Sequence, residues 1–308
     1  MKVNVMSIAI ITINYNGADN TIRLLKSLSE QTDGNFRVVV VDNASSDEDY
    51  TRLQDYTNQE SRIKNHGSEQ STSCFVIRNL LNLGFGGGCN TGIKEALRNG
   101  ADWIVLLNND TWVDADFISC LRAVLEAAGE GIVALPLDKG FRTAFGGKIE
   151  WLKSSGRHFS SKKNADANIG SLYAIGGGMA VQKSVFEKIG FFDEEYFLYF
   201  EDIDFAARAH RAGMPVKLVE RPMVQHAGSA TTKKLGSPLL LRYHYRNACY
   251  FNRKLGPWWA KMLVRPVSAF TLALQTLKIT VGQHPEESRA IRNGIEDFYS
   301  NRMGRIDR

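Results

Sequence analysis

The triplet Asn108-Asn109-Asp110 directly follows an apolar run, residues 103–107, that has the composition of a buried strand. Oxygen ligands at the end of a strand can hold a hard divalent cation, and α/β sheets bind diphosphates at their carboxyl edge. Asn and Asp are also common in turns after strands, so the triplet alone favours a plain turn. Together with the motifs below, the triplet predicts a site for a diphosphate and its cation.

A second group of reactive side chains is the acidic pair Glu201-Asp202, which follows a segment rich in aromatic residues, 191–200. Aromatic walls suit an acceptor cleft in which a partly desolvated carboxylate acts as general base. The alternative is a helix N-terminus in which the helix dipole favours acidic residues, because 203–212 has a helical pattern. The two interpretations are compatible.

His226 follows a predicted strand at 217–219. A single histidine is more often a structural or surface residue than a ligand. Together with Asp110, however, its imidazole could complete a divalent-metal site.

Asp42 ends a predicted strand at 36–41 and is followed by turn-forming residues. A carboxylate at this edge can accept hydrogen bonds from a ribose or from a base N–H. The alternative is a structural role at the cap of the next helix, because Ser45 or Ser46 precedes further acidic residues in the usual capping order.

The segment 82–92 contains five glycines in eleven residues, before a predicted helix at 91–99. We expect a loop whose backbone, at Gly84 among others, approaches a ligand closely and directs free amides at an anion. The spacing is not GxGxxG and the segment follows the third predicted strand, which disfavours a dinucleotide-binding dehydrogenase.

Strand-like runs alternate with helical patterns along the first half of the chain. This alternation predicts a parallel sheet covered by helices. A strand at 132–135 and a variable polar segment at 141–169 are expected to follow. The strands are predicted at 8–13, 36–41, 74–78 and 103–107, and the helices at 21–31, 91–99 and 116–128.

The chain of 308 residues is long enough for one large domain and an appendage, and its hydrophobic fraction of 44% is typical of a soluble enzyme. Four cysteines lack metal-like spacing, and the apolar start at 8–13 is too short for a secretory signal. We therefore expect a cytoplasmic protein with free thiols.

Charge is distributed unevenly along the chain. Residues 1–205 carry 20 Lys and Arg against 27 Asp and Glu, whereas 206–308 carry 18 against 6. The basic C-terminal part suits an anionic partner, such as nucleic acid, an anionic membrane or a diphosphate-bearing lipid, and a solvated basic helix is the alternative. The apolar stretch 257–282 is interrupted by cations and cannot span a bilayer. It is expected to contact the inner face of the cytoplasmic membrane, to cover the core or to form a homodimer interface.

In their order along residues 8 to about 250, these motifs resemble the family 2 glycosyltransferases, especially the bacterial rhamnosyltransferase-like branch. The resemblance implies a GT-A fold, with a mixed, mostly parallel sheet and helices on both faces. The motifs are Ile13-Asn14-Tyr15-Asn16, Val41-Asp42-Asn43-Ala44-Ser45, Asn82-x-Gly84-Phe85-x-Gly87-Gly88-x-Asn90-x-Gly92, Leu107-Asn108-Asn109-Asp110-Thr111, Phe192-Asp193-Glu194, Phe197-x-Tyr199-x-Glu201-Asp202-x-Asp204 and His226.

The resemblance also implies a catalytic domain at 1–230, with a basic helical extension at 231–308 for acceptor, membrane or dimer contact. The implied reaction is an inverting transfer of a sugar from a nucleoside-diphosphate sugar to a hydroxyl of a cell-surface polysaccharide, such as an O-antigen, or of a lipid-linked glycan. dTDP-rhamnose is the favoured donor and a UDP-sugar the next. A non-catalytic nucleotide-sugar-binding or scaffold relative is the alternative, and nucleic-acid binding is not expected.

The resemblance assigns roles to individual residues. Asp110 would be the main carboxylate on Mg²⁺ or Mn²⁺, with His226 as the second protein ligand. Asp202 would take the proton of the acceptor hydroxyl, while Glu201 would position the acceptor or the base. Asn108 stands where many members carry Asp, so we expect weaker metal retention without the donor. The donor would be lined by Thr12, Asn14, Asp42, Asn43, Asn82, Gly84, Asn108, Asn109 and Asp110.

Overall fold

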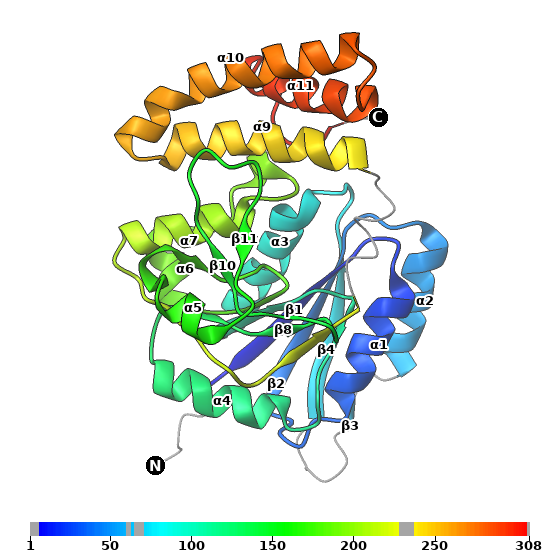
Figure 1. Ribbon diagram of the computed structural model, residues 1–308. Coiled ribbons are helices and arrows are strands. Elements are labelled where there is room, and N and C mark those ends of the chain that lie inside the picture. The colour runs from blue at the N-terminus through cyan, green and yellow to red at the C-terminus, as the bar shows by residue number, and fades with distance from the viewer. Residues whose placement is uncertain (1–5, 60–62, 65–70, 228–236, 307–308) are drawn as a thin grey trace.

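The computed structural model describes residues 6–59, 63–64, 71–227 and 237–306 (Figure 1). The domain boundary expected between 230 and 231 lies outside the described residues. In the described part, an eight-stranded sheet has the order β14-β7-β13-β5-β1-β2-β4-β3. Its strands are β1 (Ile8–Asn14), β2 (Phe36–Asp42), β3 (Ile63–Lys64), β4 (Ser71–Arg78), β5 (Trp103–Leu107), β7 (Ile132–Ala134), β13 (Gly178–Gln182) and β14 (Val216–Leu218).

The centre of the sheet is parallel, as predicted. β1 pairs in parallel with β2 and β5, and β2 with β4. The register places Asn14 beside Asp42, so the carboxyl ends of these strands meet at one edge. Strand β13, which was not predicted from the sequence, is antiparallel to both β5 and β7 and makes the sheet mixed.

Helices cover both faces of the sheet, because successive residues of a buried strand point to opposite sides. Ile10 of β1 packs in the cluster beneath one set of helices, and Ile11 packs in the cluster beneath the other. The first set is α1 (Ala18–Ser29), α2 (Asp47–Gln59) and α4 (Phe117–Ala128), and the second is α3 (Gly84–Arg98), α6 (Lys183–Ile189) and α7 (Glu201–Arg211).

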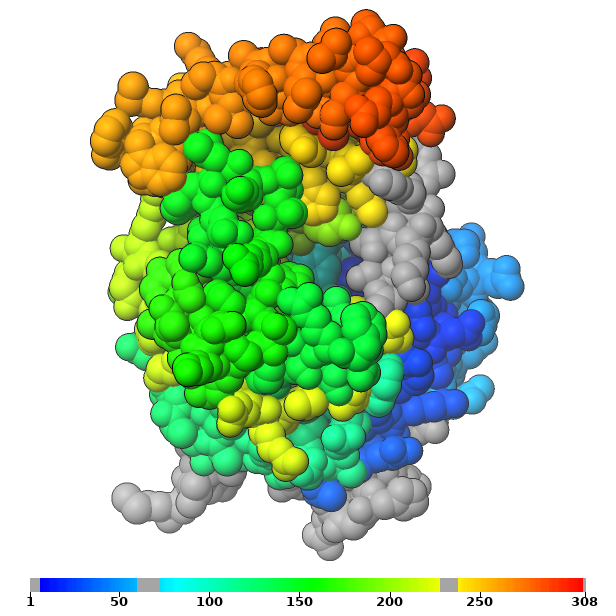
Figure 2. All heavy atoms as spheres, in the orientation of Figure 1, coloured from blue at the N-terminus to red at the C-terminus, as the bar shows by residue number. Residues whose placement is uncertain are grey.

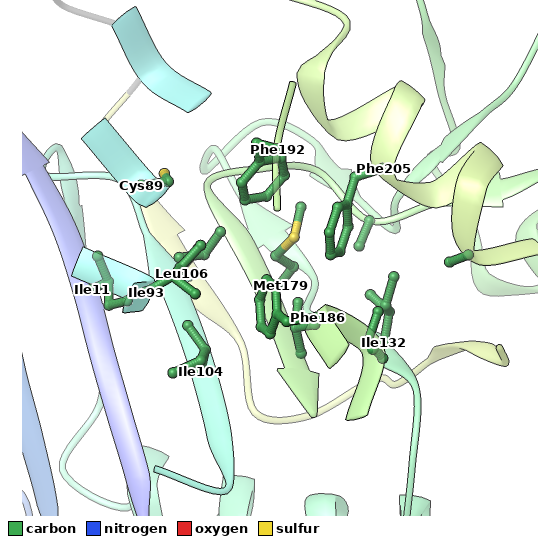
Figure 3. Packing of buried hydrophobic residues seen from close by; sticks show 14 of the residues in the cluster. Ile11, Cys89, Ile93, Ile104, Leu106, Ile132, Met179, Phe186, Phe192 and Phe205 are labelled. Atoms are coloured by element: carbon green, nitrogen blue, oxygen red, sulfur yellow. The ribbon is translucent and has the colours of Figure 1, made fainter. Parts of the chain in front are cut away.

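Figure 3 shows the second cluster, in which aromatic and aliphatic side chains fill the space between β5, β13 and their covering helices. Ile93 of α3 and Met179 of β13 are buried there. The rings of Phe192 and Phe205 pack with centroids 4.7 Å apart. Burial of each such side chain contributes about 1.5–3 kcal/mol. The cluster therefore provides a rigid base beneath the start of α7, where the acidic pair lies.

The glycine segment is not the loop that we expected from the sequence. Helix α3 begins at Gly84, so most of these glycines are helical. A Cβ atom on Gly92 would lie 2.6 Å from Cγ2 of Ile11 and 3.0 Å from Cγ2 of Val41. Each helical glycine costs about 1 kcal/mol relative to alanine. The glycines instead allow α3 to pack directly on β1 and β2.

Short elements surround the carboxyl edge of the large sheet, and the polar segment 141–169 contributes several of them, which were not predicted from the sequence. One small sheet contains β6 (Thr111–Trp112), β15 (Val224–His226), β8 (Leu137–Asp138) and β9 (Thr143–Ala144). Another contains β11 (Arg157–His158), β10 (Gly147–Lys148) and β12 (Leu172–Tyr173). The short helices are α5 (Lys162–Asp166), η1 (Ile169–Ser171) and η2 (Glu194–Tyr196).

The C-terminal part is helical, as predicted, with α9 (Ser237–Leu255), α10 (Trp258–Thr280) and α11 (Pro285–Tyr299). Helix α9 contacts α7 of the sheet domain, and α10 and α11 pack on α9 and on each other. In Figure 1 these helices lie across one end of the molecule, with α10 on the side of α9 away from the sheet. None of the described helices is long and apolar enough to cross a membrane.

Candidate active site

A cavity of about 410 Å³ opens at the carboxyl edge of the large sheet, beside α9. Figure 2 shows a hollow below α9 on this face of the molecule. Polar residues from both halves of the chain line the cavity together. The predicted site residues among its walls are Asn43, Asn82, Gly84, Asn108, Asn109, Asp110, Glu201, Asp202 and His226.

Backbone pairing brings Asp110 and His226 together, although they are far apart in the sequence. β6 and β15 are antiparallel, with Thr111 opposite His226. The amide of Ala227 donates to the carbonyl of Asp110 at 3.0 Å. As a result, Oδ1 of Asp110 lies 3.4 Å from Nε2 of His226, and both side chains are buried. The structure thus joins the two residues proposed as metal ligands.

The Asp110–His226 pair has the chemistry of a partial metal site. Ligands of one Mg²⁺ lie about 2.1 Å from the ion, so two of them fall within about 4 Å of each other. Burial lowers the pKa of His226 more than the nearby Asp110 carboxylate raises it, which favours the neutral imidazole that binds metals. No group of three or more His, Cys, Asp or Glu side chains suited to a metal occurs among the described residues. Substrate oxygens and water would have to complete the coordination.

The segment Gly176-Gly177 links the triplet to the acidic pair. The amide of Gly176 donates to Oδ2 of Asp202 at 3.1 Å. The amide of Asn108 donates to the carbonyl of Gly177 at 3.4 Å. A Cβ atom on Gly177 would lie 2.4 Å from Nδ2 of Asn108, so this approach requires glycine. Two adjacent residues before β13 therefore set the position of both groups.

The two members of the acidic pair differ in environment. Glu201 is buried, and its Oε2 atom has no hydrogen-bond partner among the described residues. Burial, with a smaller contribution from the Asp202 charge, raises the pKa of Glu201 to about 8. Burial raises the pKa of Asp202 to about 6, while the amides of Gly176 and Ile203 oppose the rise. Burial thus favours the neutral form of both carboxyls, while the amides that donate to Asp202 favour its ionised form.

The chain reaches the acidic pair through a loop in an unusual conformation. Phe197, Tyr199 and Phe200 adopt positive φ angles of 61°, 69° and 78°. Such conformations cost about 1–3 kcal/mol each in non-glycine residues and persist where the surroundings hold them. Asn247 of α9 donates through Nδ2 to the carbonyls of Tyr196, Leu198 and Tyr199 at 2.8–3.0 Å. The C-terminal helices thus hold the loop that positions Asp202.

Comparison with known proteins agrees with this geometry. The profile described as glycosyl transferase family 2 matches residues 9–190, which is more than half of the chain. The chain belongs to glycosyl transferase family 2. A second profile, glycosyl transferase family group 2, matches residues 103–282.

Characterised members of the family are distant in sequence. The chain is 25% identical over 225 residues to the low-salt glycan biosynthesis hexosyltransferase Agl10 of Haloferax volcanii, and 28% identical over 184 residues to the dTDP-rhamnosyl transferase RfbF of Shigella flexneri. These matches cover 68% and 56% of the chain but only 63% and 61% of the relatives. An N-acetylglucosaminyl-diphospho-decaprenol L-rhamnosyltransferase of Mycobacterium tuberculosis is 23% identical over 81% of the chain and 85% of its own length.

Solved structures share the fold of this family 2 chain. TarS 1–349 of S. aureus, in complex with UDP-GlcNAc, aligns over 96% of the chain and 92% of its own length, with a TM-score of 0.53 and 15% identity. The mannosyltransferase PcManGT of Pyrobaculum calidifontis, in complex with GDP-Man and Mn²⁺, aligns over 96% of the chain and 87% of its own length, with a TM-score of 0.54 and 14% identity. At this identity the likeness establishes the GT-A fold.

In this family 2 chain, three of the residues predicted to bind the nucleotide sugar do not reach the surface of the cavity. Thr12, Asn14 and Asp42 are fully buried and do not line the cavity. Nδ2 of Asn14 donates to Oδ1 of Asp42 at 2.9 Å and to Oδ2 of Asp49 at 2.8 Å. These side chains tie the ends of β1 and β2 together. Their direct contact with a nucleotide stays a prediction.

Asn43 and Asn82 line the cavity and also organise the approach to α3. Nδ2 of Asn43 donates to Oδ1 of Asn82 at 3.0 Å and to the carbonyl of Gly84 at 2.9 Å. The amides of Gly84 and Phe85 donate to Oδ1 of Asn82 and to the carbonyl of Phe197. These amides are satisfied within the protein, so the expectation that they face an anion is not supported.

Lys139 and His158, which were not predicted as site residues, also line the cavity. Lys139 lies between β8 and β9, and its charge helps to lower the pKa of both His158 and His226. Aromatic side chains, among them Phe197 and Tyr199, also line the cavity, and Tyr199 stacks on His244 of α9 with centroids 4.0 Å apart. The parallel pairing of β8 with β15 places the segment that contains Lys139 beside the strand of His226, and no local sequence pattern predicts that pairing.

Proposed function

We propose that this chain is an inverting glycosyltransferase that moves a sugar, L-rhamnose in the first instance, from a nucleoside diphosphate to an acceptor hydroxyl. The observation that carries the proposal is a cavity in which the carboxylate of Asp202, held by the amide of Gly176, shares the walls with the Asp110–His226 pair. A base and a diphosphate-binding group in one cavity are the two requirements of direct glycosyl transfer.

The donor end of the cavity is formed by the ends of β1, β2 and β5. Asn43 and Asn82 face the nucleoside, and the triplet 108–110 faces the diphosphate. Asp110 and His226 would hold Mg²⁺ or Mn²⁺, which would offset the charge that develops on the leaving diphosphate. Lys139, half-buried in the same wall, supplies a further positive charge for the leaving group.

The acceptor end is formed by the aromatic loop 196–200 and by α9. Asp202 accepts the proton of the acceptor hydroxyl while the hydroxyl oxygen bonds to C1 of the sugar and the bond from C1 to the diphosphate oxygen breaks. The electron pair of that bond leaves with the diphosphate, and attack from the opposite side inverts the anomeric centre. In its neutral form, the adjacent Glu201 can donate a hydrogen bond that positions the acceptor or the base.

The names of the relatives support a dTDP-rhamnose donor and a lipid-linked acceptor. One relative is a dTDP-rhamnosyl transferase and another uses N-acetylglucosaminyl-diphospho-decaprenol. The aromatic wall suits a sugar ring, and the basic C-terminal helices suit the diphosphate of such an acceptor. A UDP-sugar is the second donor candidate, since a protein of the same fold binds UDP-GlcNAc. The product would contribute to a cell-surface polysaccharide or an O-antigen.

The test begins with calorimetric titration of dTDP, UDP, GDP and ADP, first with Mn²⁺ or Mg²⁺ and then with EDTA. We expect metal-enhanced binding of dTDP. The matching sugar nucleotide is then incubated with a synthetic N-acetylglucosaminyl-diphospho-lipid, and the anomeric configuration of the product is read by NMR. Retention of configuration would contradict the single displacement. Donor binding without any transfer to the acceptors tested would favour a non-catalytic nucleotide-sugar-binding relative.

A further inference from the structure

Helix α10 directs its large apolar side chains away from the protein. Trp258, Met262 and Phe270 are 75%, 69% and 71% exposed. An ordinary surface helix turns such residues towards the core and presents polar side chains to solvent. The inner face of α10 has the opposite character, because its buried residues are small or polar: Ala260, Val264, Ser268 and Gln275.

These exposed side chains are concentrated on one continuous surface. Of fifteen exposed large hydrophobic side chains among the described residues, nine lie between 258 and 281. At 100° per residue they gather on the side of α10 opposite its buried face. We call this surface the outer face of α10; its central residues are Trp259, Met262, Leu263, Phe270, Leu274 and Leu277. A continuous apolar surface of this kind marks an interaction site.

Cations border the outer face, and α10 itself contains no acidic residue. α10 contains Lys261, Arg265 and Lys278, and the sequence has no Asp or Glu between 222 and 285. The helical period places Lys261 and Arg265 at one edge of the outer face and Lys278 at the other. Long basic side chains at such edges can cover apolar surface with their stems while their charges reach a polar layer.

We propose that the outer face of α10 binds the surface of an anionic phospholipid bilayer, with the helix axis parallel to the membrane plane. Apolar side chains would enter the boundary between headgroups and acyl chains, and the flanking cations would contact the anionic headgroups. Trp258 and Trp259 at the start of the helix are suited to this boundary. The other side of α10 stays packed on α9 and α11.

A second copy of the chain fits the outer face less well. A two-fold dimer brings the same surface of each copy together. The three cations of one α10 would then lie near the three cations of the other, and the helix offers no acidic side chain to pair with them. Against an anionic bilayer the same cations are favourable, and each strengthens binding about fivefold.

Helix α9 lies between the outer face of α10 and the proposed catalytic cavity. His244 of α9 lines that cavity, and its neighbour Tyr245 lines a second cavity of about 210 Å³ together with Val267 of α10. Binding of α10 to a bilayer would therefore hold the acceptor end of the catalytic cavity close to the lipid headgroups. This link to a lipid-linked acceptor rests on the proposed function, whereas the binding surface itself does not.

The test is co-sedimentation of the full-length protein with vesicles of phosphatidylcholine alone or with added phosphatidylglycerol. We expect binding to the anionic vesicles. Phe270→Ser and Leu277→Ser should each lower the partition coefficient about tenfold, because each removes a large apolar side chain from the contact. Phe141→Ser, at a site 87% exposed outside α10, is the matched control and should bind like the wild type.

The charge contribution is tested with Lys261→Gln and Arg265→Gln, which should each weaken binding to anionic vesicles about fivefold. Lys188→Gln, an exposed cation on α6, is the matched control. The proposal would be overturned if the wild-type protein did not sediment with anionic vesicles. In particular, a wild-type protein that forms a dimer, binds no vesicles and becomes monomeric on Phe270→Ser would show that the outer face is a dimer interface. The vesicles contain no nucleotide sugar and no glycan acceptor, so vesicle binding does not depend on sugar transfer. A protein that binds the vesicles but transfers no sugar would contradict the proposed function and leave the membrane-binding proposal standing.

Discussion

The carboxylate of Asp110 lies 3.4 Å from Nε2 of His226 because two short strands, β6 and β15, pair with Thr111 opposite His226. The two residues are separated by more than a hundred positions in the sequence. Their proximity therefore depends on the small sheet that contains β6 and β15, and a change in that sheet would alter the proposed metal site without replacing either proposed ligand.

His226→Ala is expected to raise the concentration of Mn²⁺ or Mg²⁺ needed for half-maximal activity by about tenfold or more, because it removes one of the two proposed protein ligands. The measurement is a metal titration of the initial transfer rate at saturating donor. Gln225→Ala changes the preceding residue of the same strand and is the matched control. An unchanged metal requirement in His226→Ala would remove His226 from the ligand set.

The pH at which sugar transfer loses activity should reflect the raised pKa of Asp202, the proposed base. A base with a pKa of about 6 is active when ionised, so kcat/KM should fall as the pH drops below about 6 and should be constant just above it. The measurement is a profile of kcat/KM against pH at saturating metal. Activity that stays constant down to about pH 4, the usual pKa of an aspartate, would show that no base with a raised pKa takes part.

Much of the sheet could be predicted from the sequence because its parallel strands are continuous apolar runs. Ile8–Asn14 and Trp103–Leu107 are buried along nearly their whole length, and such runs occur in strands covered on both faces. The acidic pair and the triplet could be identified in the sequence because each consists of polar residues that directly follow an apolar or aromatic segment. Their meeting in one cavity was not predicted, because it depends on Gly176 and Gly177, which precede the antiparallel strand β13 and bond to Asp202 and Asn108.

The helix that begins at Gly84 could not be predicted from local propensity. Four glycines between 84 and 88 indicate a loop, because glycine is a poor helix former. Close contact with Ile11 and Val41 favours the helix instead, and this contact depends on tertiary structure. Likewise, the burial of Asn14 and Asp42 follows from their mutual hydrogen bond, which the sequence pattern alone does not show.

Gly177→Ala should disturb the site by displacing the side chain of Asn108. The new Cβ atom would lie 2.4 Å from Nδ2 of Asn108, so the triplet or the start of β13 must move. A displacement of about 1 Å can lower kcat/KM about a hundredfold. Gly170→Ala is the matched control, because nothing lies within 4 Å of the added atom and φ is not positive. Equal kinetic effects of the two substitutions would contradict this account of Gly177.

Asn247→Ala tests whether α9 holds the loop before the acidic pair. The substitution removes hydrogen bonds to the carbonyls of Tyr196, Leu198 and Tyr199, so the strained loop should relax and Asp202 should lose its position. We expect kcat to fall about tenfold or more while the donor Kd, measured by calorimetry, changes little. A parallel loss of donor affinity would assign Asn247 a general structural role.

The central claim is that Asp202 is the base for sugar transfer, and Asp202→Asn tests it most directly. The variant keeps the size of the side chain but cannot accept the proton. We expect the transfer rate to fall about a thousandfold while calorimetry shows nearly unchanged, metal-dependent donor binding. Transfer at the wild-type rate would contradict the claim, and a loss of donor binding would assign Asp202 to the nucleotide site instead.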